Sequence, residues 1–598
     1  MKHRKQGEQG YVLVLVLGTI LMVAAMATMT MSLTVSEVTQ SGGNQMIARV
    51  RAAAEAGQND SLFYMTNAGL TDVNVTLSPY ADAFAAGSQN ASVTPIIPSN
   101  KYATIIDNLN KMSGTTVAGS VNTVAYTSTV KYVSMKVDEK TFSTAGQTYV
   151  LNYNVASTGT LGTFVRSVST NGQMQIRMGR KFINQFVLLA NDGGSQEGNF
   201  FANGMNYDGP VQVNQNWRFA GKPQFKYGAT TAATTVQMSA TCNPSTSAMT
   251  NVSSQYLGCT APDWGGSGLT YAAPKIDLPV NALSQQNAAL GLDPKSTATV
   301  TNAQECVQLK IVSCTSSGAP EGVYIPTDLT GNITGGIYIK GDAKNISMSV
   351  SGNSQLYSIT DKNGIVSNIM VNYSTNTTTV VKNGTTTVLK GVISGESKGA
   401  GQANGMIYST GSVLALNGPN RTAVPVANPV PAVPDPNSVP PAVAANSVIN
   451  IAAASKITVQ NDVTYEQDPR TVSSAKNVLG LMAGTGSVSI GTDAPNDVYL
   501  QAALLAGTTN QGFAVDNYNS GGYRGQIHLL GSLAEDKEPP RGQAAFVNGS
   551  IVVQQGYGDA FNFDPRFLNG GAVPPFFPAT NKFTAQSVWP SQQGWQEQ

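Results

Sequence analysis

The hydrophobic positions of the chain begin with one long apolar segment. From Tyr11 to Val35 there are 25 residues without a charge, and the short basic segment MKHRKQGEQG precedes them at residues 1–10. As a helix, this apolar segment extends roughly 37 Å, enough to cross the core of a bilayer. The basic residues should stay in the cytoplasm, so we expect everything after Glu37 to lie outside the inner membrane.

The junction between the basic and apolar segments admits three interpretations. An ordinary secretory signal would be cleaved near Ala25-Met26-Ala27, and a signal anchor would be kept whole. A prepilin signal would be cleaved between the basic leader and the apolar run, and Gly10 supplies the small residue needed there. Apolar positions at helical spacing continue over residues 38–57, where an ordinary signal would give way to polar sequence. We therefore favour a leader at 1–10 and a transmembrane pilin helix at 11–65.

Apolar and polar residues alternate between residues 119 and 190. The phrases VNTVAYTSTVKYVSMKV, TYVLNYNVAS and FVRSVSTNGQMQIRM predict antiparallel strands with one buried face. Residues 66–115 are polar and we expect them to be irregular. Together, residues 66–199 should form a β head packed on the helix.

From about residue 200, short apolar phrases ending in glycine recur. They end at Gly341, Gly411, Gly484, Gly507, Gly531 and Gly556. The last four lie 23, 24 and 25 residues apart, and the earlier gaps of 70 and 73 are close to three times that unit. A period in the twenties is typical of stacked coils. We therefore expect residues 200–598 to form a β-solenoid of about a dozen coils, with a β-sandwich as the alternative.

Two segments depart from this period. Residues 419–441 contain eight prolines and predict an extended surface excursion. The C-terminal segment is rich in aromatic residues and proline, and we expect it to cap the open end of the solenoid. Its members are Phe561, Phe563, Pro574, Pro575, Phe576, Phe577, Pro578, Trp589 and Trp595. The expected fold class is thus mainly β, with an N-terminal transmembrane helix, an antiparallel β head and a solenoid.

Composition and single residues limit the chemistry. The net charge of +1 becomes −1 without residues 1–10, which carry three cations and one anion, so bulk charge does not favour polyanion binding. The two histidines are His3 and His528. A multi-histidine zinc site cannot form outside the leader, and a catalytic triad would have to use His528. No P-loop, GxSxG or HExxH motif occurs. We expect no enzyme activity, no cofactor and no metal; a membrane-tethered glycan-active enzyme is the least favoured class.

The four cysteines form two pairs that are close in sequence. They allow three connectivities, of which Cys242–Cys259 with Cys306–Cys314 is the simplest. Disulfides suit an exported chain.

A basic and aromatic segment is the best candidate for DNA contact. No acidic residue occurs between Gly209 and Pro262. Cations contact phosphates, and aromatic faces stack on exposed bases. The candidate residues are Arg177, Arg180, Lys181, Trp217, Arg218, Lys222 and Lys226. A solvated strand edge with core aromatics explains the same residues equally well.

The N-terminus resembles the PilX-type minor pilins of type IV pili. The resemblance rests on GEQG, the following YVLVLVLGTILMVAAMATMT and RVRAAAEAGQND at 49–60, and covers about the first sixty residues. It implies cleavage after Gly10 by a prepilin peptidase, N-methylation of Tyr11, and assembly with other pilins through the helix. Major pilins carry glutamate at the fifth mature position, where this chain has Leu15. A subunit without a neighbour above it can dispense with that carboxylate, so we expect a position at the filament tip.

A second resemblance covers about residues 200–580. The segments at 201–225, 335–342 and 564–577 are similar to a domain of large pilin-like surface proteins, the ComZ-type competence minor pilins among them. This implies a solenoid-like tip domain and a role in capturing extracellular DNA during natural transformation. We therefore expect a minor pilin that resides in the inner membrane before assembly and in the pilus at the cell surface afterwards. The alternative is a surface adhesin or structural envelope protein held by the same helix.

Overall fold

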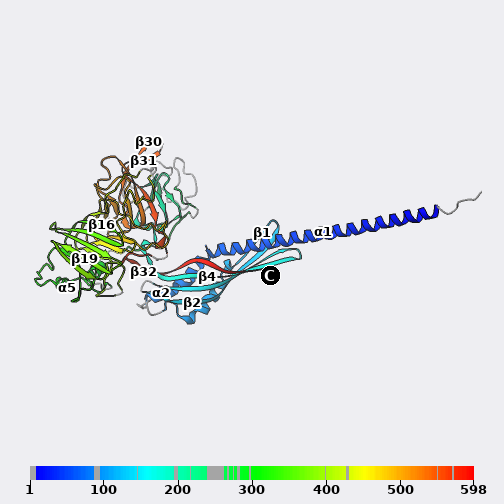
Figure 1. The fold of residues 1–598 in the computed structure, drawn as a ribbon, viewed down its shortest axis with the longest axis horizontal. Helices are drawn as coiled ribbons and strands as arrows, with labels where there is room; N and C mark the ends of the chain where they lie inside the picture. Colours follow the sequence, from blue (N-terminus) through cyan, green and yellow to red (C-terminus); the bar gives the residue numbers. More distant parts are fainter. Residues whose placement is uncertain are drawn as a thin grey trace, which may run out of the picture. The chain divides into compact units, whose positions relative to one another are not determined.

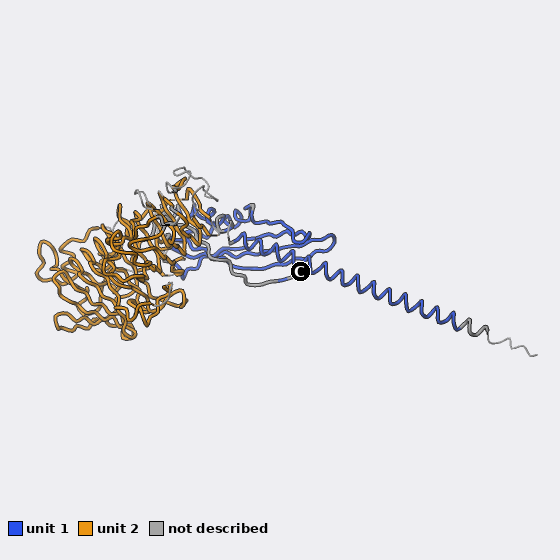
Figure 2. The backbone as a smooth tube through the Cα atoms, turned by 90° about the horizontal axis from the view of Figure 1, so that it is seen from above, with its two compact units in different colours: residues 1–180, 581–598 blue, residues 181–580 orange. Residues whose placement is uncertain are grey.

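The computed structural model describes residues 9–597 except 67, 87–94, 144–145, 194–199, 216, 239–261, 266–267, 274, 279–282, 295, 297, 398, 426–429, 548–549 and 569–571. The chain forms two compact units (Figure 2). Unit 1 comprises residues 1–180 and 581–598, and unit 2 comprises residues 181–580.

Unit 1 combines one long helix with an antiparallel sheet, as the sequence predicts. Its helices are α1 (Gln9–Thr66), α2 (Ala68–Ala86) and α3 (Tyr102–Asn110). Its strands are β1 (Thr116–Val121), β2 (Val124–Ser143), β3 (Gly146–Leu161), β4 (Phe164–Phe182) and β32 (Ala579–Glu597), in the order β1-β2-β3-β4-β32. Buried and more exposed residues alternate along β3, because one face of the sheet packs on the helices.

The expectation that residues 66–115 are irregular is wrong, because α2 and α3 lie there. Val73, Leu77 and Ala81 are spaced by four along α2 and are buried in the core of unit 1. Ile105 and Leu109 form the matching stripe on α3. The many Thr, Asn and Gly residues of this segment hide a helical pattern that tertiary packing stabilises.

Unit 2 is built almost entirely from strands. Those before residue 300 are β5 (Leu188–Asp192), β6 (Phe201–Ala202), β7 (Asn206–Asp208), β8 (Val211–Val213), β9 (Arg218–Ala220), β10 (Gln224–Phe225), β11 (Ala229–Thr231), β12 (Gln237–Met238) and β13 (Leu269–Thr270). Those up to residue 420 are β14 (Gly322–Tyr324), β15 (Ile337–Lys340), β16 (Ala343–Ser351), β17 (Ser354–Asp361), β18 (Val366–Asn372), β19 (Thr377–Lys382), β20 (Thr385–Lys390), β21 (Met406–Ser409) and β22 (Val413–Asn417). The remaining strands are β23 (Val448–Ala453), β24 (Ile457–Val459), β25 (Val478–Ala483), β26 (Val488–Ile490), β27 (Tyr499–Ala506), β28 (Phe513–Val515), β29 (Tyr523–Lys537), β30 (Gly542–Val547) and β31 (Ser550–Phe563). Two short helices, α4 (Leu283–Ala289) and α5 (Asn302–Gln308), accompany them.

Successive strands of unit 2 alternate between two sheets. In the larger sheet β15, β21, β23, β25, β27 and β29 pair in parallel, each with the next. In the smaller sheet β16, β22, β24, β26 and β28 do the same. The chain thus adds one strand to each sheet in turn, and residues such as Ile451 of β23 and Ile457 of β24 share one hydrophobic core.

The glycine phrases mark strands of the larger sheet, but the count of coils drawn from them is wrong. Gly341 and Gly411 follow β15 and β21, which are direct neighbours, so the gap of 70 is a single step. The antiparallel strands β17–β20 fill that gap (Figure 1). The gap of 73 between Gly411 and Gly484 is two steps, because β23 lies between without a terminal glycine.

The larger sheet continues across a break in the sequence. Leu533 and Ala534 of β29 pair in parallel with Leu188 and Leu189 of β5, and the order then runs β5-β8-β11-β13. The first and last strands of unit 2 therefore meet inside one sheet.

The C-terminal segment does not act as the expected cap. Phe576 and Phe577 pack with Tyr338, Tyr408 and other residues of the larger sheet, on the face opposite the shared core. Residues 581–598 belong to unit 1, where β32 pairs with β4. A domain over 200–598 is thus corrected at both ends, because the boundary falls at 180/181 and the last strand returns to the sheet of unit 1. Covering the edge of β4 satisfies backbone groups that would otherwise be unpaired.

Candidate membrane and assembly helix

The first half of α1 is an exposed apolar surface. Among the described residues, α1 is the one helix long and apolar enough to cross a membrane. Large apolar side chains from Leu15 to Val38 are exposed in unit 1, most of them by more than half of their surface. An apolar surface of this extent marks a site for lipid or for other apolar helices.

The second half of α1 is fixed to the sheet by close packing. Val50, Ala53, Ala54 and Gly57 are buried against β2 and β3. A Cβ atom at Gly159 of β3 would overlap the carbonyl oxygen of Val50. Small residues on both elements therefore let the helix lie directly on the strands.

Polar contacts fix the register of this packing. The hydroxyl groups of Ser61 and Ser128 lie 2.7 Å apart in a buried hydrogen bond. Tyr126 of β2 donates its hydroxyl to the carboxylate of Asp60, and this hydrogen bond raises the pKa of Tyr126. Arg49 donates to the carbonyl of Asn122 at 2.8 Å. The helix thus has one half held by the sheet and one half free for another partner.

The residues at the predicted cleavage point lie at the start of α1. The helix begins at Gln9, so Gly10 and Tyr11 form its first turn, and their side chains are outside the described part. Leu15 is 57% exposed. Helical geometry continues through Ser41-Gly42-Gly43 without a break. Cleavage after Gly10 and methylation of Tyr11 stay predictions.

The aromatic rings of the proposed DNA segment are buried. Trp217 is 0% exposed and packs edge-on against Phe201 and Phe225. Phe219 and Trp264 complete the same cluster, with ring centroids 5.2 Å apart. These rings form part of the core of unit 2 and do not face solvent for stacking on bases.

The lysines of this segment are exposed but face carboxylates. Lys226 contacts Asp208 at 3.0 Å, a hydrogen bond that raises the pKa of Lys226, and Lys222 lies 4.0 Å from Asp263. Both aspartates stand just outside the acid-free interval 209–262. Parallel pairing of β10 with β7, and of Gln224 with residue 263, brings them back beside the lysines.

The remaining candidates do not gather around these lysines within one unit. Arg218 donates to the side chain of Gln237 at 2.8 Å. Arg177 lies on β4 in unit 1, where burial lowers its pKa. The side chains of Arg180 and Lys181 are outside the described part.

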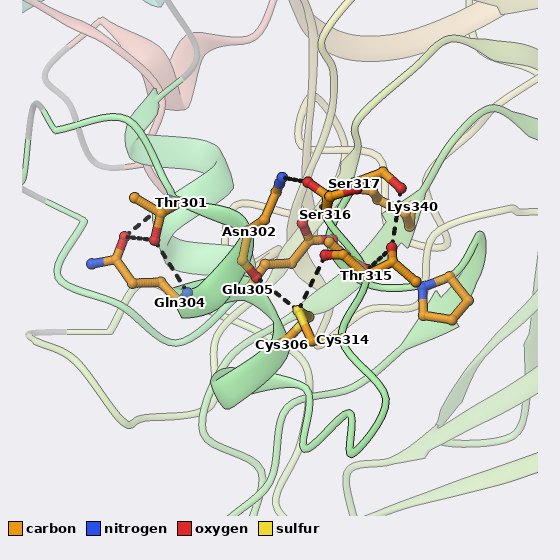
Figure 3. The surroundings of a disulfide bond; sticks show 12 residues. Thr301, Asn302, Gln304, Glu305, Cys306, Cys314, Thr315, Ser316, Ser317 and Lys340 are labelled. Carbon is orange, nitrogen blue, oxygen red and sulfur yellow. Dashed lines mark hydrogen bonds and ion pairs between the residues drawn. A yellow bond between two sulfur atoms is a disulfide. The ribbon is translucent and has the colours of Figure 1, made fainter.

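One of the two expected disulfides lies in the described residues (Figure 3). Cys306 of α5 is joined to Cys314, with Cα atoms 5.8 Å apart. Beside it, buried Glu305 forms an ion pair with Lys340 of β15 at 2.7 Å, which ties the small helix to the larger sheet. Cys242 and Cys259 lie outside the described residues.

Comparison with known proteins gives two matches. A family described as a domain of unknown function, DUF4900, matches residues 148–242. The crystal structure of the competence-associated pilin ComZ from Thermus thermophilus is 10% identical, with a TM-score of 0.30; the match covers 90% of this chain and 97% of that one. No curated protein matches.

Proposed function

We propose that this chain is a pilin-like surface protein, anchored in the inner membrane and then assembled through α1. The supporting observation is the division of α1 into an exposed apolar half and a half fixed to an antiparallel sheet. Exposing each large apolar side chain to water costs about 1.5–3 kcal/mol relative to burial. A row of such residues from Leu15 to Val38 therefore requires lipid or neighbouring helices, and a pilus offers both in turn.

The rigid attachment of α1 also suits this role. A helix that only anchors a domain needs no fixed register with it. Here Ser61 bonds Ser128, and Gly159 allows direct contact with the helix backbone. Force along a filament would pass from the helices into such heads through packed atoms rather than through a linker. A surface adhesin or structural envelope protein held by the same helix is the alternative.

Unit 2 completes the proposal as a solenoid-like domain displayed outside the cell. Its support is the alternating addition of parallel strands to two sheets around one core. The leading interpretation is a minor pilin at the filament tip, where Leu15 needs no carboxylate partner. The proposal includes no catalytic step.

The mature N-terminus tests this function. We expect mass spectrometry of the protein from sheared filaments to find N-methylated Tyr11 as the first residue. The Gly10→Val variant should keep residues 1–10 and stay in the membrane fraction. Gly18→Ala is the matched control, because a Cβ at Gly18 meets no atom within 4 Å. A native chain beginning at Thr28, or absent from both envelope and filament, would refute the proposal.

DNA contact in natural transformation is a second, separate function to test. It is supported by the exposure of Lys222 and Lys226, without the aromatic stacking first expected. If both lysines contact phosphates, replacing them with Gln should lower DNA affinity and reduce the salt slope by about two. Lys275→Gln changes another exposed lysine, which lies 3.7 Å from Asp277, and serves as control. Equal affinity of the double variant and the control would remove these lysines from any DNA site.

A further inference from the structure

Unit 2 contains a polar pocket of about 470 Å³ that the anchoring function does not use. Its walls include Ala415, Asn417, Gln460, Asn461, Asp493 and Pro495. The volume lies within the range of small-molecule sites, about 300–1,000 Å³. Apart from one alanine and one proline, these side chains are amides and a carboxylate.

The topology explains why amides and a carboxylate gather here. β22, β24 and β26 are consecutive parallel strands, so their carboxyl ends lie along one edge of the smaller sheet. Asn417 is the last residue of β22, Gln460 and Asn461 follow β24, and Asp493 follows β26 by three residues. Each level of the sheet therefore contributes hydrogen-bonding side chains to the same place, at a spacing of about 4.8 Å.

The one arginine at the pocket is already neutralised. Arg421 begins the proline-rich segment and makes two hydrogen bonds to the carboxylate of Asp462, at 2.5 and 2.9 Å. Its other N–H groups donate to the carbonyls of Asn496 and Asp497. Within the described part of the chain, the exposed carboxylate of Asp493 makes no ion pair. The pocket thus offers an uncompensated negative charge, which disfavours phosphates and other anions.

The amides of the pocket are held in place while keeping free hydrogen-bonding groups. Gln460 accepts the backbone N–H of Asp493 at 3.0 Å through Oε1, and Asn417 donates to Asn345 at 2.7 Å through Nδ2. Among the described residues, Nε2 of Gln460 and Oδ1 of Asn417 make no hydrogen bond. A donor and an acceptor are therefore fixed before a ligand arrives, which lowers the entropy cost of binding.

We propose that this pocket binds a neutral sugar residue, a hexose or an N-acetylhexosamine, of a surface glycan. A carboxylate accepts hydrogen bonds from neighbouring sugar hydroxyls, and the amides both donate and accept. Ala415 and Pro495 supply small apolar contacts for the C–H groups of a sugar ring. This inference goes beyond anchoring and display, and it depends on unit 2 alone, so it holds whether or not α1 is cleaved.

Calorimetry on the full-length protein in detergent tests the proposal. The probes are tetrasaccharides of glucose, mannose, galactose and N-acetylglucosamine, each titrated separately. We expect at least one to bind, and Asp493→Asn to weaken that binding about tenfold or more, because hydrogen bonds to a charged group are lost. Asp277→Asn is the matched control, an exposed carboxylate elsewhere in unit 2 that should leave binding unchanged.

Three results would overturn the proposal. One is failure of all four tetrasaccharides to bind at millimolar concentration. Another is equal binding by wild type, Asp493→Asn and Asp493→Ala, each with an unchanged thermal transition to show that it is folded. The third is inorganic phosphate displacing the sugar at equal concentration, since an anion site would behave in that way.

Discussion

Glu535 predicts an unusual dependence of stability on pH. This residue of β29 is fully buried; its Oε2 accepts the backbone N–H of Phe513 at 2.8 Å, and its Oε1 has no hydrogen-bond partner in the described residues. Nearby, buried Arg541 is bound by Asp559 and Glu538 at 2.7 and 2.6 Å. Burial raises the pKa of Glu535 to about 7, although Arg541 acts in the opposite direction.

The sign and size of the effect follow from this shift. The folded state holds a proton on Glu535 up to about pH 7, whereas the unfolded state releases it near 4.5. Stability from this group is therefore fully present below pH 4.5 and is lost as the pH rises through 7. Each pKa unit corresponds to about 1.4 kcal/mol, so the loss amounts to about 3 kcal/mol.

Replacing Glu535 by Gln removes the titration and keeps an acceptor for the N–H of Phe513. We expect Glu535→Gln to match the wild type at pH 5 and to be more stable by about 3 kcal/mol at pH 8. The assay is urea unfolding of the full chain from pH 5 to 8, following the transition of unit 2. Glu466→Gln is the control, because Glu466 is exposed and also accepts one backbone N–H. An equal difference between Glu535→Gln and wild type at both pH values would refute the reasoning.

Three further perturbations test the packing. Gly159→Val should push α1 off the sheet, lower stability by about 1–3 kcal/mol and speed hydrogen exchange in residues 49–61; unchanged exchange would contradict the close approach. Arg541→Met leaves two carboxylates buried without their cation and should cost about 3–5 kcal/mol in urea unfolding at pH 7; a cost under 1 kcal/mol would argue against the buried network. Replacing Cys306 and Cys314 by Ser should cost about 2 kcal/mol in non-reducing buffer and nothing relative to the wild type under reducing conditions.

Sequence patterns identified the elements whose hydrogen bonds or burial are local. The apolar run of α1 and the alternation in β2–β4 could be predicted because helix bonds join residues four apart and strand burial repeats every two. The helical stripe of α2 was missed because weak helix formers dilute it. The glycine phrases located individual strands of the larger sheet, but not the number of steps between them, since an inserted antiparallel sheet changes the spacing without changing the stacking.

The candidate sites depended more strongly on tertiary structure. The segment around Trp217 suggested DNA contact because its acidic partners lie outside the acid-free interval in sequence, yet Asp208 reaches Lys226 through strand pairing. The amides and Asp493 of the polar pocket are up to 76 residues apart. A signal was available, since each follows a strand of the repeat, but it has meaning only once those strands are known to be parallel neighbours.

The sequence by itself therefore determined a long apolar N-terminal helix, an antiparallel β head and a repeating β-rich remainder. Only the tertiary structure decided that β5 continues the sheet after β29, and that β32 returns to the sheet of unit 1. Strands distant in sequence pair through backbone N–H and C=O groups, which every non-proline residue carries. Side-chain identity indicates that a strand needs a neighbour, and the packing of the whole chain selects which one.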